Sequence, residues 1–419
     1  MNLQTNVSVQ TKSLEKDKVT IEVTIPLIRS ALEGEEIIQQ GVNAVGMLAS
    51  QKFLKNFDTD GSPIEMGVIK MTSKGQVLKE YNTPYGVVEV ERHVYQTSSG
   101  GKTFCPLDKD ARIIRLATPK LAKMISHKYS RNSVDEVTTD LGNNHGRILS
   151  REYIQIISET VGAFAQVKEE SWNYSIPQLD TSTSTVSIGV DGITMFMKGE
   201  GYRQAMVGRL ALYDAKDVGA TPEYGKEKFL QRMEVAIKNI KADYPQAKYV
   251  GIADGAKDNW TFLEKCTSIQ ITDFYHATEY ITGVSEAIFT KRQEKERQEW
   301  LSDSCHRLKH NEGAANQLLQ EFKKIKIENK IFQEKMKKVD AAISYFTNQG
   351  VRMAYAKFRS QNLPIGSGIT EAACKTIIKQ RFCGSGMKWK DKGAATVLSL
   401  RCLDKSNYWN QFWDKISQY

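Results

Sequence analysis

The sequence has no long apolar run and no apolar leader. No stretch of about 18 consecutive apolar residues occurs in the chain, so we expect no membrane span. Residues 1–18 are polar and mixed in charge, and they lack the apolar core of a secretory signal. These two absences predict a cytoplasmic protein without a membrane partner.

Closely spaced cysteine pairs are also missing. The six cysteines include no C-x-x-C pair, which argues against a zinc finger or zinc ribbon. The hairpin expected near Cys105 could carry a metal ribbon, but Cys105 is the only cysteine there. One ligand cannot hold a metal, so we interpret Cys105 as a structural residue. A disulfide framework is not expected in a cytoplasmic chain of this length. We interpret the cysteines as reduced side chains, mostly packed as small hydrophobic groups.

The charge balance is basic. The formal net charge is +9 and the isoelectric point is about 9.0, which favours a polyanionic partner such as nucleic acid. Charge alone does not identify that partner, because many basic proteins bind no nucleic acid.

The first 180 residues divide into two regions on pattern alone. Residues 1–80 contain one helical pattern over 25–47, with Pro26 expected in the first turn, and they carry no recognisable chemistry. Residues 81–180 begin with a β-hairpin over 85–106 that turns at 98–101.

Three helical patterns follow over residues 118–165. Thr118 precedes a proline at the first helix start, Gly146 marks a turn, and Ser150 caps the third helix. Three short helices with a glycine-containing turn are typical of a helix-turn-helix DNA-binding module, but also of a plain helical bundle. The sequence leaves both open. A Ser/Thr-rich linker over 166–185 predicts a domain boundary near residue 180.

From residue 186 the pattern becomes that of an α/β domain. It predicts strands over 186–192 (with 193–197 continuing extended), 204–213, 248–255 and 269–274, and helices over 226–243 and 259–265. This order indicates a mixed sheet covered by helices. A charge-rich helical insertion over 281–362 divides the core into two parts, residues 181–280 and 363–419, the second with a basic C-terminal tail.

Two histidines in the insertion are spaced to hold a metal. His306 and His310 are four residues apart, but no glutamate follows the first as in H-E-x-x-H. We therefore interpret them as solvated or DNA-facing.

Two of the predicted strands end in an aspartate followed by glycine, at Asp191 and Asp254. A carboxylate at the end of a buried strand costs desolvation free energy unless it is paired or binds a metal. If the two strands are neighbours, about 4.8 Å apart, the two carboxylates can share divalent ions, and hard oxygen ligands suit Mg²⁺. Asp273 ends the next strand and is an alternative second acid.

A third acid is expected from a Pro/Gly-containing loop that opens a helix. Glu371 lies in the first turn, after the capping candidates Ser367 and Thr370. Basic residues that could hold a DNA backbone follow it, namely Lys375, Lys379, Arg381, Lys388 and Lys390. The alternative is a capped surface helix whose Glu and Lys form i,i+4 pairs. Trp389 suits either a packed core or a base stack.

Four stretches, in this order along the chain, resemble the ISKra family of bacterial insertion-sequence transposases, within the DDE superfamily. The most specific is LPIGSGITEAACKTIIKQRFCGSGMKW, residues 363–389, which is similar to the family's glutamate-bearing segment. The others are GVVEVERHVYQ…FCPLD (86–108), LGNNHGRILSREYIQ (141–155) and the two Asp-Gly blocks. The resemblance runs from about residue 80 to the end, and residues 1–80 match no family that we can name.

The resemblance implies a ribonuclease H-like core with a helical insertion before the last acid, preceded by a mainly helical DNA-binding region with a hairpin. It places the catalytic acids and metal ligands on Asp191, Asp254 and Glu371. Asp254 is preferred to Asp273 because the superfamily's second aspartate follows the strand beside the first. Asp273 and His276 would then line the site, with His276 near DNA. The implied cofactor is a pair of Mg²⁺ ions about 3.5–4 Å apart, for which Mn²⁺ can substitute.

The implied activity is cleavage and joining of DNA. Water is expected to attack a phosphodiester at the transposon end, and the freed 3′-OH then attacks target DNA without a covalent enzyme intermediate. The implied partners are double-stranded DNA, as ends and target, and further copies of the chain in a homodimer or higher oligomer in the nucleoid. The alternatives are a metal-dependent nuclease without strand transfer and a catalytically silent DNA-binding protein or repressor.

Overall fold

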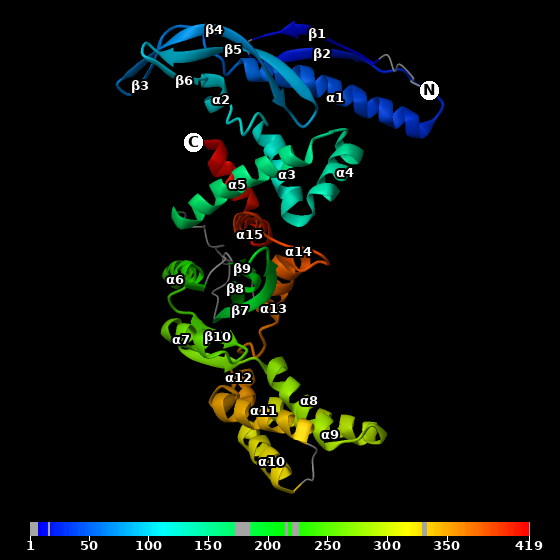
Figure 1. Ribbon diagram of the computed structural model, residues 1–419, viewed down its shortest axis with the longest axis vertical. Coiled ribbons are helices and arrows are strands. Elements are labelled where there is room, and N and C mark those ends of the chain that lie inside the picture. The colour runs from blue at the N-terminus through cyan, green and yellow to red at the C-terminus, as the bar shows by residue number, and fades with distance from the viewer. Residues whose placement is uncertain are drawn as a thin grey trace. The chain divides into compact units, whose positions relative to one another are not determined.

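The computed structural model of the chain describes residues 7–15, 17–171, 185–213, 217–219, 226–328 and 333–418. The chain divides into two units, which we describe separately (Figure 1). Unit 1 comprises the described parts of Met1–Val167 and Asn410–Tyr419, and unit 2 those of Lys168–Trp409. The C-terminal residues, expected in the core, thus group with unit 1. No helix in the described ranges has the length and apolarity that a membrane crossing needs.

Unit 1 starts with a hairpin and a long helix, β1 (Ser8–Leu14), β2 (Val19–Thr24) and α1 (Ala31–Lys55). The helix begins after Ser30, so the prediction that Pro26 lies in its first turn is wrong. The reason is that Ile25 belongs to the packing of the hairpin on the helix. Its side chain lies against Gly41, where a Cβ atom would be 2.9 Å from Ile25 Cδ1.

An antiparallel sheet follows, with the strands β3 (Ile64–Met66), β4 (Ile69–Asn82), β5 (Val87–Thr97) and β6 (Gly100–Phe104). The predicted hairpin is confirmed as β5 and β6, whereas its long neighbour β4 was not predicted. The sheet shares a core with α1 and α2 (Pro106–Asp110), in which Leu54, Tyr81 and Leu107 are buried. Cys105 is buried in the same core without a disulfide partner, in keeping with a structural role.

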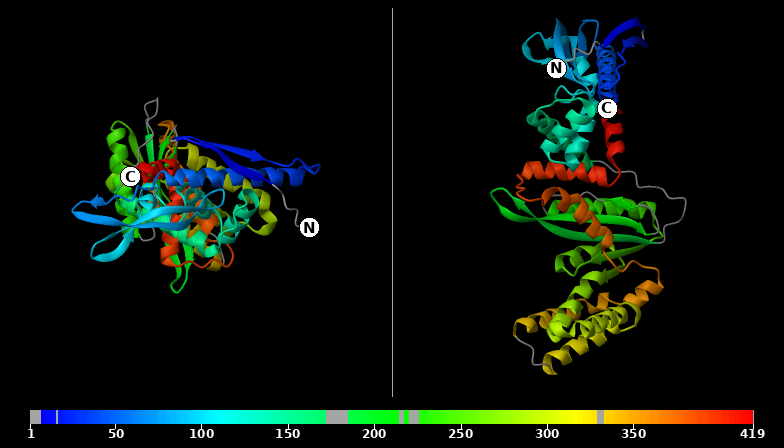
Figure 2. Two further views of the ribbon diagram at one scale, coloured as in Figure 1. Left: turned by 90° about the horizontal axis from the view of Figure 1, so that it is seen from above. Right: turned by 90° about the vertical axis from the view of Figure 1, so that its right-hand side faces the viewer.

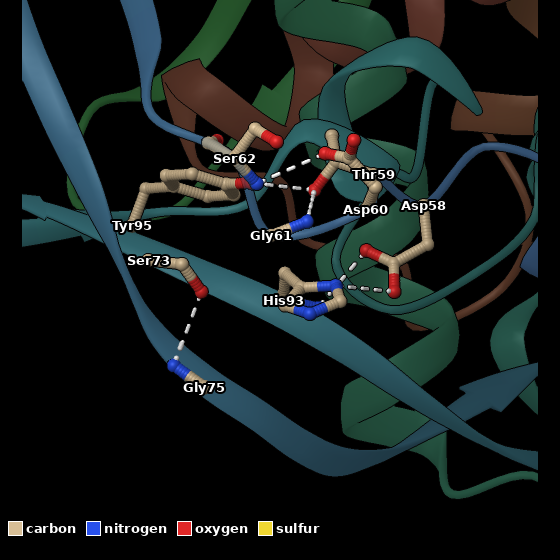
Figure 3. Close-up of polar contacts among 9 residues, drawn as sticks. All are labelled: Asp58, Thr59, Asp60, Gly61, Ser62, Ser73, Gly75, His93 and Tyr95. Carbon is tan, nitrogen blue, oxygen red and sulfur yellow. Dashed lines mark hydrogen bonds and ion pairs between the residues drawn. The ribbon is translucent and has the colours of Figure 1, made fainter.

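A loop over residues 58–62 is fastened to β5 by hydrogen bonds (Figure 3). The Asp58 carboxylate accepts two of them from His93, one from the backbone N–H at 2.9 Å and one from ring Nδ1 at 3.0 Å. The Tyr95 hydroxyl donates to the carbonyl of Ser62 at 3.0 Å. The side chains of Asp58 and His93 are only 5% and 15% exposed, so water replaces these bonds poorly if they are lost.

Helices complete unit 1, namely α3 (Pro119–Arg131), α4 (Val134–His145), α5 (Arg151–Ser171) and most of α16 (Trp409–Gln418). The first three confirm the helices predicted over 118–165. Ser133 opens α4 in a capping box with Glu136, and Gly146 ends it at φ +62°, a left-handed conformation that favours glycine. Because α5 continues to Ser171, the predicted linker starts too early, and residues 172–184 lie outside the described ranges.

Unit 2 is built on a five-stranded sheet. In spatial order its strands are β11 (Ile269–Thr272), β10 (Lys248–Ala253), β7 (Thr185–Met197), β8 (Gly201–Tyr213) and β9 (Asp217–Gly219). β8 is antiparallel to β7 and to β9, whereas β10 is parallel to β7 and to β11. The predicted α/β class and mixed sheet are confirmed, while β9 was not predicted.

Helices cover both faces of this sheet (Figure 2, right). On one face, α6 (Lys226–Asp243) and α7 (Lys257–Cys266) share a buried cluster with β7, β8 and β10. The other face takes α13 (Gly368–Ala373). Gly189 of β7 makes this close approach possible, because a Cβ atom there would collide with Thr370 Oγ1.

The insertion is helical, as predicted. Its elements are α8 (Phe274–Ile288), η1 (Lys291–Gln293), α9 (Glu294–His310), α10 (Ala314–Glu328), α11 (Gln333–Gln349), η2 (Gly350–Arg352) and α12 (Tyr355–Ser360). It begins inside α8, and its helices share one buried cluster with β10 and β11. His306 and His310 stack their rings 4.4 Å apart, and Arg359 Nη1 lies 2.7 Å from His310 Nδ1, an arrangement that does not favour a metal there.

We predict that Asp58→Ala lowers the free energy of unfolding of unit 1 by about 1–3 kcal/mol, because it leaves the two N–H donors of His93 without their acceptor. Calorimetric melting of the full chain, with hydrogen exchange at β5, measures the loss. The matched control is Asp60→Ala, since the exposed Asp60 carboxylate accepts one hydrogen bond, from Ser62 N–H at 2.9 Å. Equal stability of both variants would contradict the role assigned to Asp58.

Candidate active site

Asp191 lies in the middle of β7, on the face that α13 covers. Side chains alternate along a strand, so Asp191 points to the same face as Gly189, the residue in contact with Thr370. The neighbouring strand β10 ends at Ala253, and its last pair with β7 joins Ile252 to Gly189. Beyond that pair, the next bridge of β7 on this side joins Met197 to Trp389, six residues after Asp191.

Asp254 follows β10 directly. Extending the register by two residues from the pair of Ile252 and Gly189 brings Asp254 level with Asp191. The Asp254 carboxylate accepts the N–H of Ala256 at 3.1 Å, and Asp254 lines the neighbouring pocket. The parallel pairing of β7 and β10 thus brings together the two aspartates that the sequence predicted.

The turn that carries Asp254 rests on α11 of the insertion. Tyr345 Oη donates to the carbonyl of Asp254 at 2.6 Å, and Gln349 Nε2 donates to the carbonyl of Gly255 at 3.0 Å. Gly255 has φ +119°, and a Cβ atom there would lie 2.9 Å from Tyr345 Cε2, so glycine is required twice over. A helix far along the chain therefore positions the second aspartate.

Asp191 and Asp254 line one pocket of about 330 Å³. Gln204 of β8 and the first residues of α7, including Asn259, complete its wall. Asn259 is buried, and its Nδ2 donates to the carbonyl of Val190 at 3.3 Å, which ties the start of α7 to β7. The lining of the pocket thus includes three aspartates (Asp258 is the third), one lysine (Lys257) and two amides, and the sequence pattern gave no signal for Asp258 or the amides.

Asp273 has a different position. It is fully buried at the start of α8, where Oδ1 accepts the N–H of His276 at 2.6 Å and Oδ2 accepts the N–H of Ser367. Its strand, β11, is separated from β7 by β10. Both carboxylate oxygens are occupied by backbone donors, so Asp273 caps α8 and anchors the loop before α13, and it does not line the pocket of the other two aspartates.

Glu371 lies in α13, on the helix that packs against β7. Its side chain is exposed, and Oε1 accepts a hydrogen bond from Ser367 Oγ at 3.1 Å. Thr370 of this helix contacts Gly189, which lies two residues before Asp191 on β7. Glu371 is not among the residues that line the pocket, so the structure brings its helix, but not its carboxylate, to the two aspartates.

Cys374 connects the two parts of the site. It is 3% exposed, and its thiol donates to Asp191 Oδ2 at 3.4 Å. Burial raises the pKa of the Cys374 thiol, and the charges of Asp191 and Glu371 raise it further, so it stays a neutral donor. The sequence analysis missed this residue, although its position three residues after Glu371 places it on the same helical face.

The pKa of Asp191 is raised above its ordinary value of 3.8. Burial is the largest cause, and the charge of Asp254 adds to it. The hydrogen bonds from Gly192 N–H, at 2.7 Å, and from Cys374 act in the opposite direction, as does the nearby His276. A half-buried carboxylate beside a second one is the electrostatic condition that a bound cation relieves.

The helix after α13 continues as a π-helix, η3 (Cys374–Lys379), and a last short turn, α14 (Gln380–Phe382). Arg401 of α15 (Asp391–Lys405) stabilises it, since Nε donates to the carbonyl of Ile377 at 2.6 Å and Nη2 donates to that of Thr376. π-helical segments are rare and frequently occur at functional sites. The sequence predicts a regular helix, so the π turn changes the direction of every residue after Glu371.

The predicted DNA-contacting cations separate into two groups. Four lysines are exposed, namely Lys375, Lys379, Lys388 and Lys390. Arg381 is 5% exposed and its guanidinium Cζ lies 4.8 Å from the ring centre of Trp389, which favours packing over a phosphate contact. Trp389 Nε1 donates to the carbonyl of Phe382 at 3.3 Å, so the packed-core alternative is the better supported one for this residue.

His276 lies on the side of the site that faces the insertion. Its Nδ1 is 3.1 Å from Glu279 Oε2, and its ring meets Tyr280 and Tyr345 edge-on with centroids 5.7 and 5.8 Å away. It is half-buried and lines a pocket together with Tyr280.

The donor chemistry of the site suits a hard divalent cation. Asp191 and Asp254 present carboxylate oxygens to one pocket, and oxygen ligands are those that Mg²⁺ and Mn²⁺ prefer. Within the described ranges, no three His, Cys, Asp or Glu side chains lie close enough together to hold one ion. The two aspartates therefore fit a shared cation, and Glu371 joins them only if its exposed side chain turns away from Ser367.

Comparisons with known proteins add no family to this geometry. The sequence matches no model of a protein family and no curated protein.

We predict that Asp191→Asn melts at a higher temperature than the wild type at neutral pH in the absence of divalent ions. The pKa of Asp191 is raised in the folded state, so at pH values above it the ionised carboxylate lowers the stability of the folded chain. This destabilisation vanishes below pH 3.8, because the carboxyl group is then protonated in both the folded and the unfolded state. Thermal melting across the acid range measures the difference. Asp243→Asn, which changes an exposed acid, is the control. A lower melting temperature for Asp191→Asn at neutral pH would show that the carboxylate is not destabilising.

Proposed function

We propose that this chain is a transposase of a bacterial insertion sequence, of the DDE type, and that the sheet of unit 2 is a ribonuclease H-like core. The observation that carries the proposal is the pocket shared by Asp191, which lies within β7, and Asp254, which directly follows the adjacent parallel strand β10. The helix of Glu371 packs on the first of these strands. The resemblance of residues 363–389 to the ISKra family names the same three acids.

The position of the insertion supports the same proposal. It lies between β11 and the helix of Glu371, where the resemblance expects it. Asp254 is the second acid on this account, because β10 is the strand beside β7. The two backbone hydrogen bonds that Asp273 accepts favour Asp254 over it for that role.

The chemistry assigned to the site is in-line displacement at phosphorus. Two Mg²⁺ ions bound by Asp191, Asp254 and Glu371 would supply activation of a water molecule and neutralisation of the departing oxygen. In the first step an O–P bond forms from water and the bond from phosphorus to the 3′ oxygen breaks. In the second, the freed 3′ oxygen forms a bond to a phosphorus of target DNA and loses its proton, while the bond from that phosphorus to the target's 3′ oxygen breaks and releases a target 3′-OH. One site therefore serves both steps.

The protein's own contribution is to hold the DNA backbone and the carboxylates in place. Four exposed lysines on η3 and the segment after α14 offer phosphate contacts beside Glu371, namely Lys375, Lys379, Lys388 and Lys390. Cys374 orients the carboxylate of Asp191, and Tyr345 fixes the turn of Asp254. The three helices of unit 1 are proposed to bind the terminal repeats, and joining two ends requires two copies of the chain.

We predict that Asp191→Asn, Asp254→Asn and Glu371→Gln each abolish Mg²⁺-dependent cleavage while DNA binding is retained, because they remove metal ligands and no phosphate contact. The substrate is the DNA that flanks the gene, with cleavage read on gels and binding by mobility shift. Asp243→Asn is the matched control. Near-normal cleavage by Asp191→Asn would end the two-metal account.

The same preparation separates the alternatives. A pre-cut 3′-OH end incubated with target plasmid gives joined products for a transposase and none for a simple nuclease. Tight binding of the wild type without any cleavage would indicate a repressor.

A further inference from the structure

A second pocket, of about 420 Å³, lies between α8 and α11 beside the carboxylates. Its wall includes His276, Glu279, Tyr280, Gly283, Glu286 and Lys338. None of the roles assigned above uses this pocket. It is separate from the aspartate pocket, with which it shares no lining residue.

Aromatic rings form one side of this pocket. Tyr280 and Tyr345 are stacked, with ring centroids 3.9 Å apart and an interplanar angle of 13°. Tyr345 covers one face of Tyr280, while Tyr280 itself lines the pocket and is half-buried. His276 stands edge-on to both rings. The pocket therefore offers a rigid aromatic surface to a planar ligand.

This aromatic surface is coupled to the second aspartate. Tyr345 is the residue whose hydroxyl donates to the carbonyl of Asp254 at 2.6 Å. The charge of Asp254 also contributes to the raised pKa of Tyr280, for which burial is the larger cause. A group stacked on Tyr280 would thus lie on the other side of that ring from Tyr345, the residue that holds the turn of Asp254.

The polar groups of the pocket select against a phosphate. Glu279 and Glu286 both line it, and their negative charges repel phosphate oxygens. The charges are locally balanced, since Glu279 pairs with His276 and Glu286 pairs with Lys338. Carboxylate acceptors and an ammonium donor around an aromatic surface match the hydrogen-bonding edge and the flat face of a nucleobase.

We propose that this pocket binds an unpaired nucleobase of the DNA strand whose phosphate lies at Asp191 and Asp254. The inference deepens the proposed function and rests on it. Stacking on Tyr280 would hold the base out of the duplex and keep the strand end in place between cleavage and joining.

Gly283 provides a variant that leaves the rings intact. A Cβ atom there meets only Lys338 Cβ, at 3.7 Å, so Ala fits and a larger side chain extends into the pocket. Gly283→Leu therefore fills the pocket, with Gly283→Ala as its matched control. Tyr280→Leu removes the stacking surface while keeping an apolar side chain, and Tyr280→Phe keeps the ring.

The experiment compares two probes by fluorescence anisotropy with the full-length chain, a blunt duplex and the same duplex with a single-stranded thymidine tail. Ca²⁺ is present to neutralise the carboxylates. Tyr280→Leu and Gly283→Leu are expected to bind the tailed probe about tenfold more weakly than the wild type, equivalent to about 1.4 kcal/mol. Both should bind the blunt duplex as the wild type does, and Tyr280→Phe and Gly283→Ala should match the wild type on both probes.

A photocrosslink identifies the contact directly. A 5-iodouracil placed in the tail should crosslink to Tyr280 or His276 and lose this crosslink in Gly283→Leu. Unchanged affinity of both leucine variants for the tailed probe, or an equal loss on both probes, would overturn the pocket assignment while Asp191-dependent cleavage persisted. Absence of any DNA binding by the wild type would overturn the proposed function as well.

Discussion

The parallel pairing of β7 with β10 is the constraint on which the site depends. It brings Asp254 level with Asp191 although 62 residues separate them in the chain, and it directs both side chains to one pocket. The pairing of β10 with β7 ends two residues before the aspartates, so their carboxylates lie where these two strands are no longer paired. An ionised carboxylate in this position costs free energy. The pKa of Asp191 reflects that cost, since burial and the charge of Asp254 both raise it.

The rest of unit 2 holds this pair in place from two directions. The insertion supports Asp254 through Tyr345 and Gln349 of α11, and Asp273 joins the start of α8 to the loop that opens α13. From the other face, α13 packs on Gly189 and brings Cys374 to Asp191. The helical insertion is therefore part of the site's architecture as well as an addition to the sheet.

Local patterns predicted β5 to β8, β10, β11, most helices and the turn at Asp254, because hydrophobic periodicity and turn residues are local signals. The prediction that a strand ends at Asp191 is wrong, because β7 continues to Met197 in its pairing with β8. The hairpin before α1 and the start of that helix were missed, since Ile25 serves a contact with Gly41 that only the folded chain creates. The role of Cys374 and the burial of Arg381 depend on tertiary neighbours, Asp191 and Trp389, that lie far away in sequence. The π turn of η3 likewise depends on Arg401, a buried residue of another helix. The resemblance singled out Glu371, and no local pattern could place its carboxylate.

The central claim is that three carboxylates distant in sequence hold a pair of divalent cations. Anomalous diffraction from crystals of the full-length chain soaked with Mn²⁺ tests it most directly. The account predicts two peaks about 3.5–4 Å apart, ligated by Asp191 and Asp254, with the side chain of Glu371 turned away from Ser367 to complete the set. Mn²⁺ bound elsewhere in the same crystals, with no peak between Asp191 and Asp254, would contradict it.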